Sequence, residues 1–187
     1  MEKTCLTLAA LAVAVPAAAQ TRIDVPAFDS VGLRGGGTVV VRHGDRQSVT
    51  LIRGNLETSR FRVDSDGKLE ILACVRSCRD YELRVEIITP RLDAAGIEGG
   101  GEIRAEGVFP ERDTLAIGID GGGEIDMTAI PAETVAAGIN GGGLILAHAE
   151  EHLAAGINGG GEIRYRGRPE VTSAIDGGGS VESISRD

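Results

Sequence analysis

The sequence predicts an all-β fold, a parallel β-helix of about eight coils. Six copies of one short phrase carry this prediction: a small residue, an aliphatic residue, a variable residue, three glycines, a second variable residue and a second aliphatic residue. The triplets begin at residues 35, 99, 121, 141, 159 and 177, so the last four intervals are 22, 20, 18 and 18 residues. A regular period near 20 residues is typical of stacked repeats.

Apolar residues alternate on both sides of each triplet. Ala137 and Ile139 precede the fourth triplet and Ile145 follows it, at even separations that place all three on one side of an extended chain. Turn-rich segments such as 130–133 and 148–151 separate the copies, and no stretch has the length and period of a helix. Stacked at about 4.8 Å, the copies would align their aliphatic residues into inward ladders.

The first half of the chain is less regular. The 64 residues between the first and second triplets leave room for two coils without a triplet. An antiparallel meander or sandwich is the competing architecture, because Asp-Gly and Asn-Gly pairs are hairpin signals. In either case we expect strands near Val49–Arg53, Arg60–Asp64, Lys68–Cys74 and Tyr81–Thr89.

The amino-terminal segment predicts export. A basic start at Lys3, an apolar run from Cys5 to Val15 and a small-residue site ending at Ala19 are typical of a secretory signal peptide. The run is shorter than the roughly 20 residues that a membrane helix needs. We therefore expect residues 1–19 to be removed and residues 20–187 to form one domain without an integral membrane segment.

The composition of the chain argues against several classes of binding partner. The formal net charge is −9 at pH 7, which argues against nucleic acid as a partner. Aromatic residues make up 3% of the chain and Trp is absent, so aromatic sugar platforms are scarce. Cys74 and Cys78, the two cysteines left after signal cleavage, predict one disulfide in an oxidising compartment. Half of a metal site is the alternative, although no histidine or second cysteine pair lies near it.

Metal and catalytic motifs are weak. The segment from His148 to His152 matches the inverted zinc-protease pattern H-x-x-E-H, but that chemistry needs a helix and a third ligand. We expect a polar corner there, with no cofactor and no catalytic residue. A secreted carbohydrate-active enzyme is a remote alternative that rests on fold analogy. Calcium binding is a further alternative, because hard cations bind several oxygen ligands and four acidic residues are expected to lie on two adjacent coils. These residues are Glu98, Glu102, Asp120 and Glu124.

One predicted surface is almost free of side chains. The outward positions one and three residues before each aliphatic residue are nearly all alanine or glycine, and flat sheet faces of this kind suit close packing against a partner or a second copy. An alternative is that small residues simply let the copies stack evenly. The candidate interaction face comprises Ala94, Gly96, Ala116, Gly118, Ala136, Gly138, Ala154, Gly156, Thr172 and Ala174.

These residues resemble a bacterial family, the head GIN domain, described as a "putative auto-transporter adhesin". The runs Gly138-Ile139-Asn140 and Gly156-Ile157-Asn158 carry the resemblance, which extends from about Phe28 to Ile184. It implies that the β-helix is right-handed and that the protein is exported to the periplasm or the cell surface. We therefore expect a non-catalytic binding or adhesion module. The alternative is a cell-envelope protein that self-associates through its Ala/Gly face.

Overall fold

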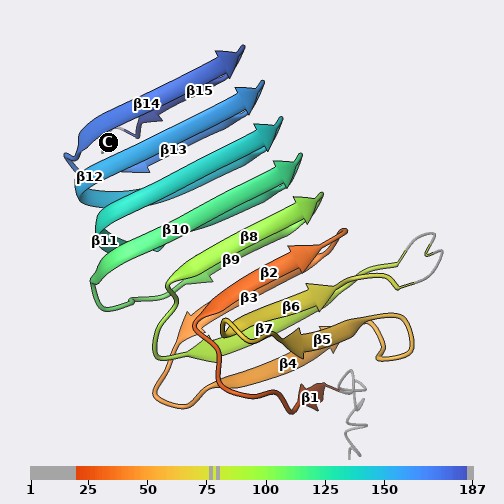
Figure 1. The fold of residues 1–187 in the computed structure, drawn as a ribbon. Coiled ribbons are helices and arrows are strands. Elements are labelled where there is room, and N and C mark those ends of the chain that lie inside the picture. The colour runs from red at the N-terminus through yellow and green to blue at the C-terminus, as the bar shows by residue number, and fades with distance from the viewer. Residues whose placement is uncertain (1–19, 76–77, 79–80, 185–187) are drawn as a thin grey trace, which may run out of the picture.

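The computed structural model describes residues 20–75, 78 and 81–184, so the expected signal peptide, residues 1–19, lies outside the described residues. Within these ranges, fifteen strands form one sheet (Figure 1). The strands are β1 (Thr21–Ile23), β2 (Ser30–Arg34), β3 (Thr38–His43), β4 (Ser48–Arg53), β5 (Arg60–Val63), β6 (Lys68–Leu72), β7 (Arg84–Thr89), β8 (Ala94–Gly99), β9 (Glu102–Glu106), β10 (Arg112–Gly121), β11 (Glu124–Gly141), β12 (Leu144–Gly159), β13 (Glu162–Arg166), β14 (Glu170–Gly177) and β15 (Ser180–Ser183).

The sheet folds back on itself into two layers. Pairing in the first layer, which we call the front layer, runs β5-β6-β2-β8-β10-β11-β12-β14. In the second, the back layer, it runs β1-β4-β7-β3-β9-β11-β12-β13-β15. The first halves of β11 and β12 pair in the back layer and their second halves pair in the front layer, so both strands join the layers.

The core lies between the layers and is apolar. Corresponding aliphatic residues of successive repeats are direct neighbours in the parallel register, as Ile119, Ile139 and Ile157 are, each at most 4% exposed. Among the described residues, Ser59 and Thr89 are the polar ones that are buried. Burial of these aliphatic side chains, worth about 2 kcal/mol each, is the main force that holds the layers together. No helix among the described residues is long and apolar enough to cross a membrane.

The glycine triplets make the corners from front layer to back layer. Gly141 has φ +129°, a conformation that side chains rarely adopt, and a Cβ there would clash with the carbonyl oxygen of Gly121. That carbonyl accepts a hydrogen bond from Gly142 N at 2.9 Å, so the ladder of hydrogen bonds continues around the corner. The corner therefore needs glycine for both its dihedral angle and its close approach to the preceding repeat.

The expected parallel β-helix, right-handed and of about eight coils, is wrong. The sheet is a nearly closed mixed barrel in which β1 and β4, β4 and β7, and β5 and β6 are antiparallel. In addition, the segments 130–133 and 148–151, expected to be corners, lie inside the continuous strands β11 and β12. Register shifts on both sides of Pro131 bend β11 without ending it, since a bulge tolerates a residue that donates no backbone hydrogen bond.

The periodicity misled the prediction in the irregular half of the chain. Strands form close to all four expected places, as β4, β5, β6 and β7. The strands β6 and β7 run parallel to β2 and β3, whereas β4 is antiparallel to β7 and β5 is antiparallel to β6. Asp66-Gly67 makes the hairpin between β5 and β6, with Gly67 at φ +79°. Asp64 fixes this turn, since its Oδ1 accepts hydrogen bonds from the backbone N–H groups of Asp66 and Lys68. In this segment the Asp-Gly pair indicated the antiparallel hairpin correctly, whereas the repeat period did not.

A matched pair of substitutions tests the corners. Gly141→Ala adds a methyl group at a positive φ and against a carbonyl oxygen, whereas Gly142→Ala places its methyl group where no atom lies within 4 Å. We expect Gly141→Ala to lower the free energy of unfolding by at least about 2 kcal/mol and Gly142→Ala to leave it nearly unchanged. Urea unfolding followed by circular dichroism measures both. Equal midpoints for the two variants would contradict this account of the corner.

Candidate functional site

The outer surface of the front layer carries two columns of small residues that cross the strands. Residues of one column are direct register partners on β8, β10, β11, β12 and β14. The structure thus gathers all ten residues of the candidate interaction face. The alanine column comprises Ala94, Ala116, Ala136, Ala154 and Thr172; the glycine column comprises Gly96, Gly118, Gly138, Gly156 and Ala174.

Nothing inside the protein explains the glycine column. A Cβ on Gly118, Gly138 or Gly156 would meet no atom within 4 Å, and none of these residues has a positive φ. Glycine within a strand costs roughly 0.5–1 kcal/mol relative to alanine, because it loses more conformational freedom on folding. These residues differ in this respect from the glycines of the corners, and they leave the backbone of the front layer open to close approach from outside.

A groove of about 740 Å³ follows the glycine column from β14 to β2. A second hollow of about 540 Å³ lies over the alanine column and shares Gly96, Gly118 and Gly138 with the groove. From Gly96 to Ala174 the column crosses five neighbouring strands, or about 19 Å at the usual strand spacing. The front layer therefore presents a shallow channel floored by backbone and methyl groups.

A basic side chain covers one end of the groove. The Lys68 side chain lies over Gly32, so that a Cβ on Gly32 would clash with Lys68 Cε and lie 3.1 Å from Nζ. Among the described residues, no carboxylate lies within ion-pair distance of the Lys68 ammonium group. The neighbouring Arg34 donates a 2.9 Å hydrogen bond to Glu98. Arg62 donates a hydrogen bond to Glu70 and so lowers the pKa of that carboxyl group.

Sequence reasoning missed this end of the groove. Gly32 occupies the same motif position as Gly96, and the repeat alone would have placed it in the glycine column. No repeated motif in the sequence indicates that Lys68 and Glu70 lie at the groove. They belong to β6, which pairs with β2 only because the irregular segment between the first two triplets returns to the sheet.

Polar side chains line one rim of the groove. They alternate along the strands with the buried isoleucines and lie in register with one another. Asn140 Nδ2 donates a 3.3 Å hydrogen bond to Asp120 Oδ1, and the amides of Asn140 and Asn158 separate Asp120 from Asp176 along the rim. The rim therefore offers mainly hydrogen-bond acceptors and negative charge to a molecule in the groove; it comprises Glu98, Asp120, Asn140, Asn158 and Asp176.

The back layer carries ion pairs on its outer surface, as the β5, β6 and β2 end of the front layer does. Arg42 on β3 donates hydrogen bonds to Glu86 on β7 and to Glu106 on β9. The hydrogen bond from Arg42 lowers the pKa of Glu106, and the same contact raises the pKa of Arg42. Charged side chains thus cover the back layer, whereas small side chains leave the front layer open from β8 to β14.

The structure does not gather the two candidate metal motifs into a ligand set. Glu98 and Asp120 lie in the front layer, while Glu102 and Glu124 lie across the corner in the back layer. The Glu102 carboxylate is 3.2 Å from an Arg104 guanidinium nitrogen. The H-x-x-E-H segment is a strand, and within residues 20–75, 78 and 81–184 no group of three histidine, cysteine or acidic residues could hold a metal ion.

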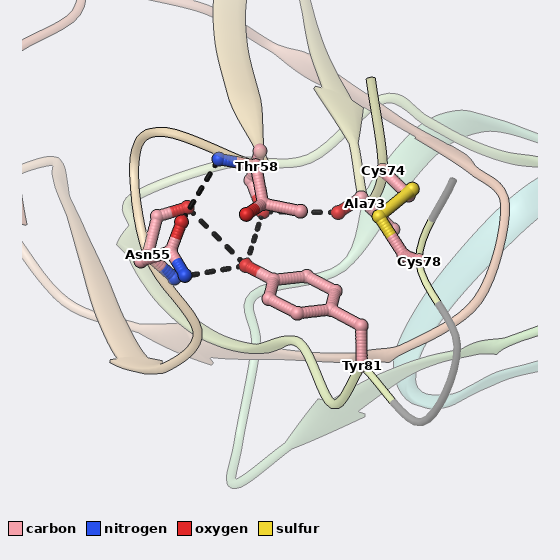
Figure 2. Close-up of a disulfide and its surroundings, with 7 residues drawn as sticks. Asn55, Thr58, Ala73, Cys74, Cys78 and Tyr81 are labelled. Carbon is pink, nitrogen blue, oxygen red and sulfur yellow. Dashed lines mark hydrogen bonds between the residues drawn. A yellow bond between two sulfur atoms is a disulfide. The ribbon is translucent and has the colours of Figure 1, made fainter. Parts of the chain in front are cut away.

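A disulfide joins Cys74 to Cys78 beside a polar cluster (Figure 2). The Tyr81 hydroxyl accepts a 2.8 Å hydrogen bond from the backbone N–H of Asn55 and lies 2.6 Å from Ser59 Oγ. Ser59, which is buried, donates to the carbonyl oxygen of Ala73 at 3.0 Å. These contacts connect the turn between β4 and β5 to the chain that leaves β6. The disulfide closes a short loop next to this connection.

Removal of the disulfide tests its contribution. The sequence separation is 4, and closure of so short a loop restricts the unfolded chain by about 2 kcal/mol. We expect the double variant Cys74→Ser and Cys78→Ser to lose about that much free energy of unfolding. Unfolding in urea with and without reductant measures it: reductant should shift the parent to the midpoint of the variant and leave the variant unchanged. A parent that ignores reductant would contradict this contribution.

Comparison with known proteins gives one family match. Residues 111–169 match the family described as "Putative auto-transporter adhesin, head GIN domain". The resemblance seen in the sequence is thereby confirmed for this part of the chain. No curated protein matches.

Among solved structures, the chain is similar to a "putative adhesin" from Bacteroides fragilis NCTC 9343, with 16% identity, a TM-score of 0.48 and coverage of 88% of this chain and 96% of that one. A "putative lipid binding protein" from Parabacteroides distasonis ATCC 8503 has 17% identity, a TM-score of 0.39 and coverage of 89% and 96%. A "putative adhesin" from Parabacteroides merdae ATCC 43184 has 14% identity, a TM-score of 0.39 and the same coverage.

Proposed function

We propose that this chain, which carries a head GIN domain over residues 111–169, is an exported, non-catalytic binding module whose groove engages a partner of the adhesion type. The glycine column is the observation on which this proposal depends. Four successive strands, β8, β10, β11 and β12, carry glycine at a position where neither the backbone conformation nor the packing of the protein itself requires it. Close approach of a bound molecule to the backbone explains why these positions carry glycine.

The chemistry of the groove favours a partner with hydrogen-bond donors and positive charge. The rim supplies two amides and three carboxylates, of which Glu98 is paired with Arg34, and the formal net charge of the chain is −9 at pH 7. Such a surface attracts cationic partners and repels anionic ones, with an effect that weakens as salt rises. The floor has almost no side chains, so it suits an extended basic polypeptide segment that lies across the strands.

Substitutions on the groove floor test this proposal. The double variant Gly118→Val and Gly138→Val fills the floor with side chains that point into open space, so we expect folding to be kept. Binding to an immobilised set of extended peptides of graded net charge is the measurement. The parent should bind the basic peptides, and the double variant should bind at least about tenfold more weakly because the backbone is no longer accessible.

The matched control is Gly122→Val with Gly142→Val. These residues are also open to solvent but lie at the corners, away from the groove, and the control should bind like the parent. Equal binding by the floor variant and the control, or no binding of basic peptides by the parent, would contradict the proposal.

Self-association through the same face is a second candidate function. The hollow over the alanine column exposes methyl groups side by side, and a flat face of this kind packs well against a copy of itself. In this alternative the floor variant would convert an oligomer into a monomer in light scattering. A parent that is already monomeric would exclude it.

We also place the protein in the periplasm or on the cell surface of a bacterium, with residues 1–19 as a signal peptide and residues 20–187 as a single domain. The composition of the amino terminus and the family description support this placement. We expect the mass of the purified native protein to correspond to a chain that begins at Gln20. External protease on intact cells should remove a surface protein and spare a periplasmic one. A native chain that retains residues 1–19 would contradict export by cleavage.

A further inference from the structure

The repeat formed by β14 and β15 leaves its apolar ladder uncovered. Leu153 and Ile157 on β12 are 1% and 3% exposed, whereas their register partners on β14, Val171 and Ile175, are 37% and 44% exposed. All eight residues of β14 are exposed. The surface that β14 presents outward is therefore the one that each earlier repeat uses to bind the next.

The strand edges at this end are also unpaired. Among the described residues, β14 pairs only with β12, and β15 pairs only with β13. Figure 1 shows β14 at the extreme of the stack, with its outer edge free. An unpaired edge presents a row of backbone donors and acceptors that can add another strand.

The opposite end of the sheet is protected. The edge strand β1 has only three residues, and the edge strand β5 carries the exposed side chains of Arg60 and Arg62. Short edges and charged side chains prevent pairing between edges. The central part of β14, from Val171 to Ile175, has neither proline nor a charged residue.

The exposed edge is symmetric in chemical character about Ser173. Val171 and Ile175 lie two residues on either side of it in the inward ladder, and the small residues Thr172 and Ala174 lie next to it on the outer face. If two copies pair antiparallel about a two-fold axis at Ser173, Val171 of each copy lies opposite Ile175 of the other. Cross-strand pairs of this kind stabilise a sheet, and a two-fold interface requires such self-complementarity.

We propose that two copies of this chain associate end to end through the β14 edges, antiparallel and two-fold symmetric at Ser173. The interface continues the repeat-to-repeat packing of the front layer and covers Val171 and Ile175. It uses the outer edge of β14, where Ala174, Ile175 and Asp176 also line the end of the groove. The groove floor on β8, β10, β11 and β12 stays free, so substitutions there test the proposed function separately. The same register places Glu170 opposite Asp176, and repulsion between these carboxylates makes the association stronger as salt rises.

Light scattering and sedimentation of the mature protein over a concentration series test the association. The parent should dimerise, and its dissociation constant should fall when salt rises from about 0.05 to 0.5 M, because screening removes the repulsion between carboxylates. Ile175→Lys should weaken the dimer at least about tenfold, since two charges would enter the interface. The matched control is Val108→Lys, a residue that is 86% exposed elsewhere in the chain and should leave the dimer unchanged.

A cysteine at the two-fold axis tests the register. In an antiparallel pair, residues directly opposite each other have Cα atoms within the range that a disulfide spans. Ser173→Cys should therefore form a covalent dimer under mild oxidation, whereas Thr114→Cys, exposed on β10, should not. A parent that is monomeric at every concentration and salt, or an Ile175→Lys variant that dimerises like the parent, would overturn the proposal. Loss of the dimer in the groove-floor variant alone would assign the contact to the Ala/Gly face instead.

Discussion

The close approach of successive glycine triplets is the constraint on which the regular half of the protein depends. At the last four corners, a glycine with φ close to +128° leaves room for the carbonyl oxygen of the preceding repeat, and the next N–H donates a hydrogen bond to that oxygen; these glycines are Gly121, Gly141, Gly159 and Gly177. A side chain there would push the repeats apart and shift the register. Because the register holds, the isoleucines before and after the corner align, and their burial closes the core between the layers.

Glycine therefore has two separate roles in one repeated phrase. Gly141 is required by its dihedral angle and its contact with Gly121, whereas Gly138, three residues earlier, is required by neither. The second kind reduces the stability of the strand and leaves its backbone accessible in the groove. Separation of the two kinds supports a binding role for the front layer, since an explanation from stacking alone covers only the corners.

The two ends and the two layers of the sheet are unlike one another. Ion pairs such as Arg42 with Glu106 cover the back layer, and antiparallel strands with exposed arginines end the sheet at β1 and β5. From β8 to β14, columns of alanine and glycine leave the front layer without such a covering. The accessible surface thus divides into the groove, which we propose for a basic partner, and the β14 edge, which we propose for a second copy.

The sequence by itself determined the all-β class, the alignment of successive triplets and the composition of the face, because triplets at a regular spacing fix which residues alternate inward and which align. Only the tertiary structure decided the direction of the strands in the irregular half and the continuity of β11 through Pro131. Antiparallel pairing of β5 with β6 depends on one turn, and the bend in β11 depends on bulges that hydrophobic alternation does not reveal. Lys68 reached the groove for the same reason: its strand pairs with β2 across a sequence separation that no local pattern encodes.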